Sequence, residues 1–205
     1  MTSIIFISTI IALIYYFITL TINILKRKRI FSELRILAII VSTYSIMWFI
    51  SYLLSGDKMV SLGTDICFDD WCATITNAEQ SQTLGFDGLV VKPKGQFIIL
   101  SISMSNHARG IAQKPSEPRI HLIDESGKSW SFSEEGQNAL ERHSGNQIAL
   151  DSKLELHQTL KTQMVFDVPK ESKDLKAVIE EGPWITKLLF KEERKVFKIL
   201  NNNDL

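Results

Sequence analysis

Two long uncharged runs constrain this chain more than any other feature. The first extends from Ile4 to Leu25 and the second from Ile36 to Leu54, and neither contains a charged residue. At about 1.5 Å of rise per residue, a helix of this length crosses the roughly 30 Å hydrocarbon core of a bilayer. The polar members are mostly Ser and Thr, whose hydroxyls can bond back to helix carbonyls. The pattern predicts two transmembrane helices, at about residues 4–25 and 36–54.

Two other interpretations of these runs fit the sequence less well. A buried core helix is usually shorter and amphipathic, and neither run shows a polar face. A cleaved signal peptide needs a basic start and a cleavage site of small residues. The chain begins MTS, without a base, and the first run ends NIL, which is not an A-x-A site.

A short basic connector joins the two runs and predicts their orientation. It reads KRKRIFSELR over residues 26–35, and its bases are Lys26, Arg27, Lys28, Arg29 and Arg35. Short loops rich in Lys and Arg stay on the cytoplasmic side of a membrane. We therefore expect the rest of the chain to lie in the periplasm or outside the cell, beyond a multi-pass anchor in the cell (inner) membrane. Binding of the connector to anionic lipid headgroups is a second interpretation.

The charge balance differs between the two parts of the chain. Residues 1–55 hold five bases and one acid, a net charge of +4, while residues 56–205 hold 18 bases and 22 acids, a net charge of −4. The formal net charge of zero is thus the sum of two unlike parts, which indicates two environments. An acidic part without a basic cluster argues against nucleic acid as a partner.

After a linker at residues 56–63, the sequence shows short alternating segments typical of β-strands. The clearest is QFIILSISMSN, residues 96–106, in which Ile98, Leu100, Ile102 and Met104 share one face. Further strands are expected at residues 71–79, 89–91, 119–123, 129–132, 160–168, 175–180, 186–190 and 196–200, and helical turns at 134–142. Many short strands separated by turn signals predict an all-β sandwich over residues 64–200, with a flexible tail at 201–205.

Three of these segments resemble a known family. They are a glycine-led strand ending in Asn (GQFIILSISMSN, 95–106), a strand with a D-x-x-G-K turn (RIHLIDESGKSW, 119–130) and a strand ending in F-D-V-P (QMVFDVPK, 163–170). Their order and spacing resemble the bacterial domain family of unknown function DUF4352, which is related to secreted mycobacterial antigens of the MPT63 type. The resemblance implies an immunoglobulin-like sandwich in an extracytoplasmic setting, with no catalytic residues to carry over. One departure is HQT at 157–159, where the family tends to have Pro-Gly.

No arrangement of residues in the sequence points to catalysis or to a cofactor. The four histidines have no H-x-x-x-H or H-E-x-x-H spacing, and the chain has no G-x-S-x-G, phosphate loop or dinucleotide fingerprint. We therefore expect that the protein is not an enzyme. The weak metal candidates are Asp65, Asp69, Asp70 and Asp87, whose oxygens could surround calcium, although solvated turn acids are the alternative.

The only two cysteines, Cys67 and Cys72, lie in DICFDDWCATIT, residues 65–76. A redox pair is usually C-x-x-C at a helix N-terminus, and two ligands are too few for structural zinc. In an oxidising compartment, a disulfide that closes a turn is the favoured interpretation.

The function expected from these features is binding or scaffolding by a membrane-anchored β-sandwich. Its partners would be the lipid bilayer and a protein, and Trp184 in the segment GPWI is a candidate contact, with packing at the sandwich edge as the alternative. The other hypothesis is an accessory subunit of a larger membrane assembly. In that case the helices form the interface through small polar residues, namely Ser8, Thr9, Ser42, Thr43 and Ser45.

Overall fold

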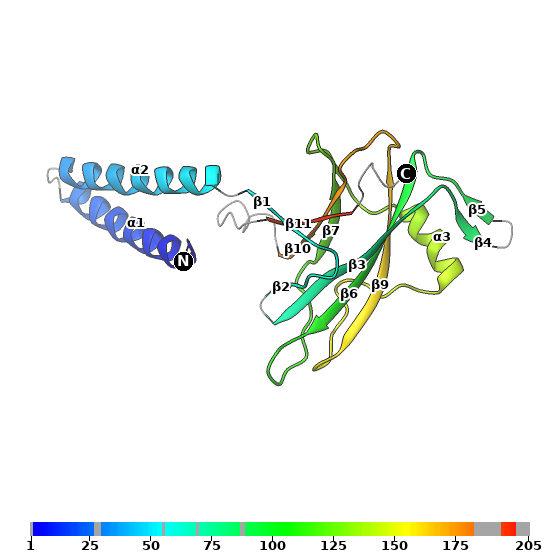
Figure 1. Ribbon diagram of the computed structural model, residues 1–205. Helices are drawn as coiled ribbons and strands as arrows, with labels where there is room; N and C mark the ends of the chain where they lie inside the picture. The colour runs from blue at the N-terminus through cyan, green and yellow to red at the C-terminus, as the bar shows by residue number, and fades with distance from the viewer. Residues whose placement is uncertain are drawn as a thin grey trace. The chain divides into compact units, whose positions relative to one another are not determined.

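The computed structural model describes residues 2–26, 30–54, 56–68, 70–86, 89–182 and 194–199. It divides into a helical unit and a β domain, which are described separately (Figure 1). This architecture confirms the predicted fold class, an immunoglobulin-like β-sandwich preceded by a helical hairpin.

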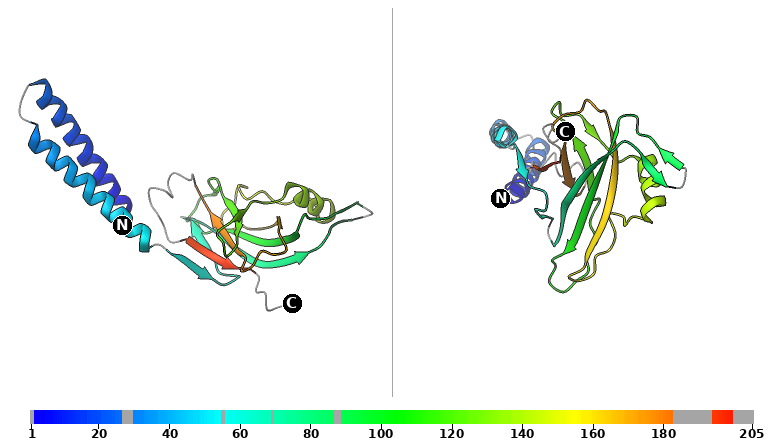
Figure 2. Two further views of the ribbon diagram at one scale, coloured as in Figure 1. Left: turned by 90° about the horizontal axis from the view of Figure 1, so that it is seen from above. Right: turned by 45° about the vertical axis from the view of Figure 1, so that its right-hand side comes forward.

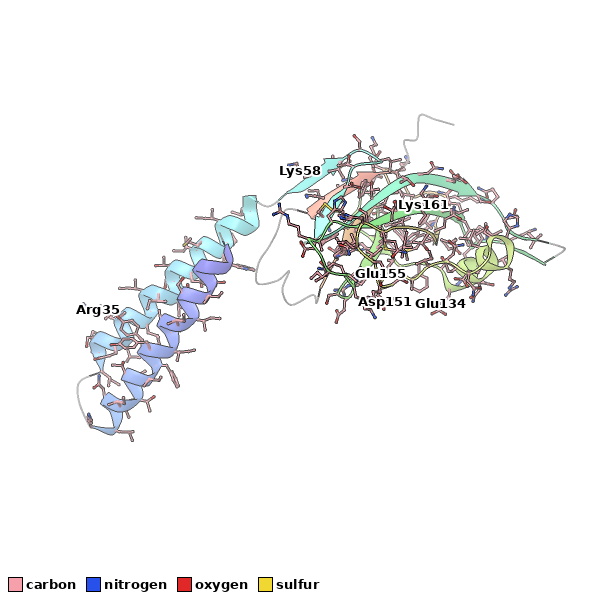
Figure 3. All side chains as sticks on the ribbon, turned by 90° about the horizontal axis from the view of Figure 1, so that it is seen from below. Arg35, Lys58, Glu134, Asp151, Glu155 and Lys161 are labelled. Atoms are coloured by element: carbon pink, nitrogen blue, oxygen red, sulfur yellow. A yellow bond between two sulfur atoms is a disulfide. The ribbon has the colours of Figure 1, made fainter. Side chains whose placement is uncertain are left out.

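The helical unit consists of α1 (Thr2–Leu25) and α2 (Phe31–Leu54). By length and composition, both helices could cross a membrane, and none of the residues in their apolar stretches is buried within the protein. The second helix begins five residues before the predicted start at Ile36, so residues 31–35 of the predicted loop are helical. Among these, Arg35 is labelled in Figure 3.

Polar groups in the hairpin are satisfied locally. The Thr19 hydroxyl donates to the carbonyl oxygen of Tyr15, and the Thr21 hydroxyl to that of Phe17, each at 2.9 Å. This is the back-bonding by which hydroxyls are tolerated in an apolar helix. Near the turn, the Asn23 side-chain amide donates to a Glu33 carboxylate oxygen at 2.9 Å and so links the two helices.

The β domain is a sandwich of two sheets, which Figure 2 shows from two further directions. The four-stranded sheet has the order β2 (Ile66–Phe68), β3 (Trp71–Ser81), β6 (Gln96–Asn106), β9 (Thr159–Val168). The five-stranded sheet has the order β1 (Asp57–Val60), β11 (Arg194–Lys198), β10 (Lys176–Glu180), β7 (Arg119–Ile123), β8 (Ser129–Trp130). A separate hairpin is formed by β4 (Leu84–Phe86) and β5 (Leu89–Val91).

The core lies between the two sheets and follows the predicted alternation. The four apolar β6 residues on one face are at most 1% exposed: Ile98, Leu100, Ile102, Met104. They pack against inward side chains of the other strands, among them Leu122, Phe166, Ala177 and Phe197. Burial of an aliphatic side chain of this size stabilises the fold by about 1.5–3 kcal/mol. The two-residue period of β6 therefore predicted the central strand of the core correctly.

The predicted linker at residues 56–63 is wrong in part, because Asp57–Val60 form β1. This strand pairs in parallel with β11, so that Asp57 faces Arg194 in the register. The Arg194 guanidinium also contacts both carboxylate oxygens of Asp57, at 2.9 and 3.0 Å. The sequence did not predict β1, because an edge strand with exposed residues shows no alternation of apolar and polar residues. Its partner strand β11 also lies far away in the sequence. The sandwich consequently begins before residue 64.

A helix and a hairpin form a third layer on the outer face of the four-stranded sheet. The helix α3 (Glu134–Ser144) and the β4–β5 hairpin cover an apolar cluster of Phe97, Ile99, Leu140 and Val165, with Leu84 and Val91 at its margin. The helix approaches β9 closely at Gly136, where an added Cβ would lie 2.6 Å from a Val165 methyl. The sequence predicted helical turns here, although not the apolar sheet face beneath them.

The open edge of β9 is hydrogen-bonded by two glutamine side chains and one backbone N–H, which take the place of a neighbouring strand. The Gln137 amide accepts from the Val165 N–H at 3.1 Å and donates to the Gln163 carbonyl at 3.0 Å. The Ser133 N–H donates to the Val165 carbonyl, and Gln147 Oε1 accepts from the Gln163 N–H. Exposed sheet edges are templates for aggregation, so this arrangement protects the protein from edge-to-edge pairing.

The remaining predicted elements agree or lie outside the described residues. The last predicted strand, 196–200, is found at Arg194–Lys198. The predicted strand at 186–190 and the tail at 201–205 lie outside the described residues.

Candidate functional site

The predicted disulfide is confirmed and closes the β2–β3 hairpin. Cys67 and Cys72 face each other directly in the register and are bonded, with an S–S distance of 1.98 Å. The flanking pair, Phe68 and Trp71, stack their rings with centroids 5.0 Å apart. The Trp71 indole N–H also donates to a carboxylate oxygen of Glu181 at 2.8 Å. This stretch therefore has a structural role, as a clip at the start of β3.

The acidic metal candidates are only partly within the described residues. The carboxylate of Asp70 accepts from the Gln113 side chain at 3.2 Å, and its carbonyl accepts from the His107 N–H at 2.7 Å. Among the described residues, no three or more His, Cys, Asp or Glu side chains come together as metal ligands. Asp69 and Asp87 lie outside the described residues, so the calcium site remains an untested prediction for this turn.

Two further sets of predicted residues are described only in part. Of the basic connector, Lys26 forms the turn after α1, and the Arg35 guanidinium lies 5.5 Å from the Phe31 ring centroid. Arg27, Lys28 and Arg29 lie outside the described residues, as does Trp184. The proposed partner contact at Trp184 is therefore still a prediction.

The glycine-led strand and the F-D-V-P strand are joined by a pair of hydrogen bonds, which we call the clamp. The Asp167 carboxylate accepts from the N–H of Lys94 at 2.8 Å and from the N–H of Gly95 at 3.1 Å. A Cβ at Gly95 would lie 2.1 Å from the Val168 carbonyl oxygen, so only glycine fits. The two motifs are therefore the two halves of a structural contact between β6 and β9.

The D-x-x-G-K motif is a hydrogen-bonded turn. One Asp124 carboxylate oxygen accepts from the N–H groups of Ser126 and Lys128 and from the Ser126 hydroxyl, at 2.6–3.0 Å. Gly127 has a φ of +81°, which glycine adopts at little cost. These bonds, the Ser126 hydroxyl first, hold the pKa of Asp124 below its ordinary value. The following Lys128 ammonium lies 5.3 Å from the Trp130 ring centroid.

The Asn that ends β6 organises the loops at that end of the strand. Asn106 is 2% exposed and donates from its side chain to the carbonyls of Ile111 and Leu154, each at 3.0 Å. Its side-chain oxygen accepts from the Ala108 N–H at 2.8 Å. The departure from the family pattern falls nearby, at His157, which adopts a φ of +58°. Here a non-glycine residue occupies a left-handed conformation that glycine would favour.

The described part of the β domain contains an open cleft of about 500 Å³. Three chain segments meet there: residues 94–95 before β6, residues 130–135 between β8 and the first turn of α3, and residues 167–171 at the end of β9. Its volume falls within the range of about 300–1,000 Å³ that is typical of small-molecule sites. The aromatic rings come from Trp130, which is half-buried, and Phe132, which is 46% exposed.

The floor of the cleft is rigid, and its rim is charged. The Asp167 carboxylate is already occupied by two N–H donors, and the Ser133 hydroxyl accepts from the Gly136 N–H. The rim carries Lys94, Lys170, Glu135 and Glu171, all exposed. The cleft therefore combines apolar side chains with charges of both signs.

One hydrogen bond joins a potential nucleophile to a base. The Ser105 hydroxyl and His107 Nε2 lie 3.0 Å apart at the end of β6. A hydrolytic pair of this kind also needs donors for an oxyanion and a site that excludes water. Neither residue lines the cleft, and the His107 side chain is exposed. This bond is therefore better explained as a surface contact.

The cleft could not be found from the sequence, because its lining comes from three separate segments between Lys94 and Glu171. The local signal was Trp130 and Phe132, two aromatic residues at a spacing of two directly after the D-x-x-G-K turn. Such a pair places both rings on one side of an extended chain.

No family model and no curated protein matches the sequence. Several solved structures are similar. A conserved hypothetical protein from Bacillus anthracis has a TM-score of 0.48 and 16% identity, over 58% of this chain and 87% of that one. An uncharacterised β-sandwich protein from Clostridium difficile has a TM-score of 0.46 and 18% sequence identity, over 71% of this chain and 96% of that one. The secreted protein MPT63 from Mycobacterium tuberculosis has a TM-score of 0.46 and 11% sequence identity, over 70% of this chain and 98% of that one. The similarity concerns the fold alone.

Proposed function

We propose that this protein is a membrane-anchored binding or scaffolding module whose β-sandwich works outside the cytoplasm. Two long apolar helices support the membrane anchor, and the basic connector between them supports a cytoplasmic turn. The Cys67–Cys72 disulfide supports an oxidising compartment for the domain, the periplasm or the cell exterior. In this proposal the anchor is multi-pass, in the cell (inner) membrane.

The observation that carries the binding role is the open cleft. Its floor is held by Asp167, whose two hydrogen bonds join the start of β6 to the end of β9. Its walls present the Phe132 ring to solvent, together with lysine and glutamate side chains that form no ion pair with another described residue. Preformed concave sites that combine aromatic walls with a few polar groups are typical of ligand binding. We propose a binding role without catalysis, with the lipid bilayer and a protein as partners and no nucleic acid.

We further propose that the domain is of the DUF4352 type. The three resembling segments each serve the fold in this chain: Gly95 and Asp167 as a clamp, Asp124 as a turn and Asn106 as a loop anchor. Structural roles of this kind are consistent with a resemblance that implies a fold and no catalytic residues.

A second candidate is an accessory subunit of a larger membrane assembly. It is favoured by the helical unit, in which none of the residues in the apolar stretches is buried within the protein. Such faces are available to other helices as well as to lipid.

Site-specific photo-crosslinking in cells separates the two candidates. A photoreactive residue would replace Phe132 in the cleft, Ile39 in α2, or Val90 on the β4–β5 hairpin as a control, all of which are exposed. The binding-module proposal predicts adducts at position 132 that are absent at position 90. Adducts at position 39 alone would favour the subunit, and adducts at none of these positions would contradict both candidates.

A further inference from the structure

We infer that the cleft binds a dipolar ligand of the peptide class, one that carries a cationic and an anionic group on either side of an apolar side chain. The inference deepens the proposed binding role and rests on it.

The first argument is the set of unpaired charges on the rim. Lys94 and Lys170 supply two ammonium groups, while Glu135 and Glu171 supply two carboxylates. None of the four forms an ion pair with another described residue, whereas lysines elsewhere do: Lys114 pairs with Asp151 and Lys153 with Glu155, whose acidic partners are labelled in Figure 3. The rim therefore keeps both signs of charge available to a ligand.

The second argument is that the third carboxylate at the cleft is not available. Both oxygens of Asp167 accept backbone N–H groups, at 2.8 and 3.1 Å. Asp167 is thus a fixed part of the floor of the cleft. The charged side chains that remain for a ligand are two lysines and two glutamates. A simple anion such as phosphate would meet two carboxylates, and a metal cation would meet two ammonium groups. A ligand with both signs can pair with the lysines through its anionic group and with the glutamates through its cationic group.

The third argument is the apolar wall of the same cleft. Trp130, Phe132 and Pro169 line the same cleft. The Lys128 ammonium lies over the Trp130 ring, and Phe132 is 46% exposed. An exposed aromatic ring in a cleft favours a ligand with an apolar group. A peptide combines that group with two opposite charges, whereas a neutral glycan would leave the four charges unused.

The test measures binding of three probes to the full-length protein in detergent by calorimetry. The probes are the unblocked tripeptide Ala-Phe-Ala, the same tripeptide acetylated and amidated, and the disaccharide of N-acetylglucosamine. We expect the unblocked peptide to bind about tenfold or more tightly than the blocked one, because blocking removes both charges. Equal affinity of the two peptides, preference for the sugar, or no binding of any probe would overturn the inference.

Variants assign the binding to the cleft. Lys94→Gln and Lys170→Gln should each weaken binding of the unblocked peptide about threefold to tenfold, and Phe132→Ala should weaken both peptides. The matched control is Lys173→Gln, an exposed lysine near the cleft that does not line it. Equal melting temperatures would establish that the variants are folded. If no peptide binds while crosslinking at position 132 still captures a protein, the inference fails and the binding role stands.

Discussion

The N–H of Gly95, the residue before β6, donates to the Asp167 carboxylate of β9 at 3.1 Å, although the two residues are 72 positions apart in the chain. The same glycine lies so close to the next residue of β9 that an added Cβ would be 2.1 Å from the Val168 carbonyl oxygen. This contact joins the start of the central strand to the end of its neighbour and forms the floor of the cleft.

Replacement of Gly95 by alanine should therefore disrupt both the fold and the cleft. The Cβ meets backbone atoms that cannot rotate away, so we expect a loss of roughly 2–3 kcal/mol in the free energy of unfolding. Denaturant unfolding of the full-length protein would measure it. Gly56→Ala is the control, because nothing lies within 4 Å of its Cβ position. A Gly95 variant as stable as that control would disprove the close contact.

Gln137→Ala should expose the edge of β9. The substitution leaves the Val165 N–H and the Gln163 carbonyl without partners, at a cost of about 1–2 kcal/mol. It should also raise the tendency to aggregate, which light scattering during heating would detect. Asn138→Ala, at an exposed neighbouring position on α3, should change stability by less than about 0.5 kcal/mol. Identical aggregation of the two variants would argue against edge protection by Gln137.

The turn at Asp124 predicts a specific dependence on pH. Its pKa is lowered in the folded state, so its contribution to stability is complete above the ordinary value of 3.8 and is lost as the pH falls through the lower folded-state pKa. Asp124→Asn should therefore flatten the acid limb of a plot of melting temperature against pH. The control variant Glu125→Gln should keep a steeper acid limb than the Asp124→Asn variant. Parallel acid limbs for the two variants would rule out this role of Asp124.

The disulfide should pin the hairpin without holding the whole fold together. For a loop this short, the restriction of the unfolded chain by the disulfide predicts a stabilisation of the folded state by about 2 kcal/mol. The double variant Cys67→Ser/Cys72→Ser should thus fold with a lower melting temperature. Under oxidising conditions, alkylation should add no mass to the wild-type protein until reductant is supplied. Immediate alkylation at two sites would mean that the thiols are free.

The sequence predicted those features that depend on local pattern. The two-residue period of residues 96–106 placed β6 and its buried face, and the absence of charge in the two long runs placed both helices. It missed β1, because Asp57 and Lys58 are exposed and their partner strand β11 begins at Arg194. It also missed the covered outer face of the sheet, where Val165 is buried by a helix that begins 31 residues earlier.

The candidate site was harder to predict because its parts are not adjacent in the chain. Cys67 and Cys72 are close in sequence and paired as expected. The cleft instead combines Lys94, Phe132 and Lys170, which only the fold brings together. Asp70, a candidate metal ligand in the sequence, accepts hydrogen bonds from Gln113 and His107.

The most direct test of the account is the side of the membrane on which the sandwich lies. In a Cys67→Ser/Cys72→Ser background, a single cysteine would be placed at Lys153, whose side chain is 64% exposed, or at Ile30 in the turn between the helices. A membrane-impermeant thiol reagent would then be added to intact cells. The account predicts labelling at position 153 in intact cells and at position 30 only after permeabilisation. Labelling at position 30 in intact cells, with position 153 protected, would contradict it.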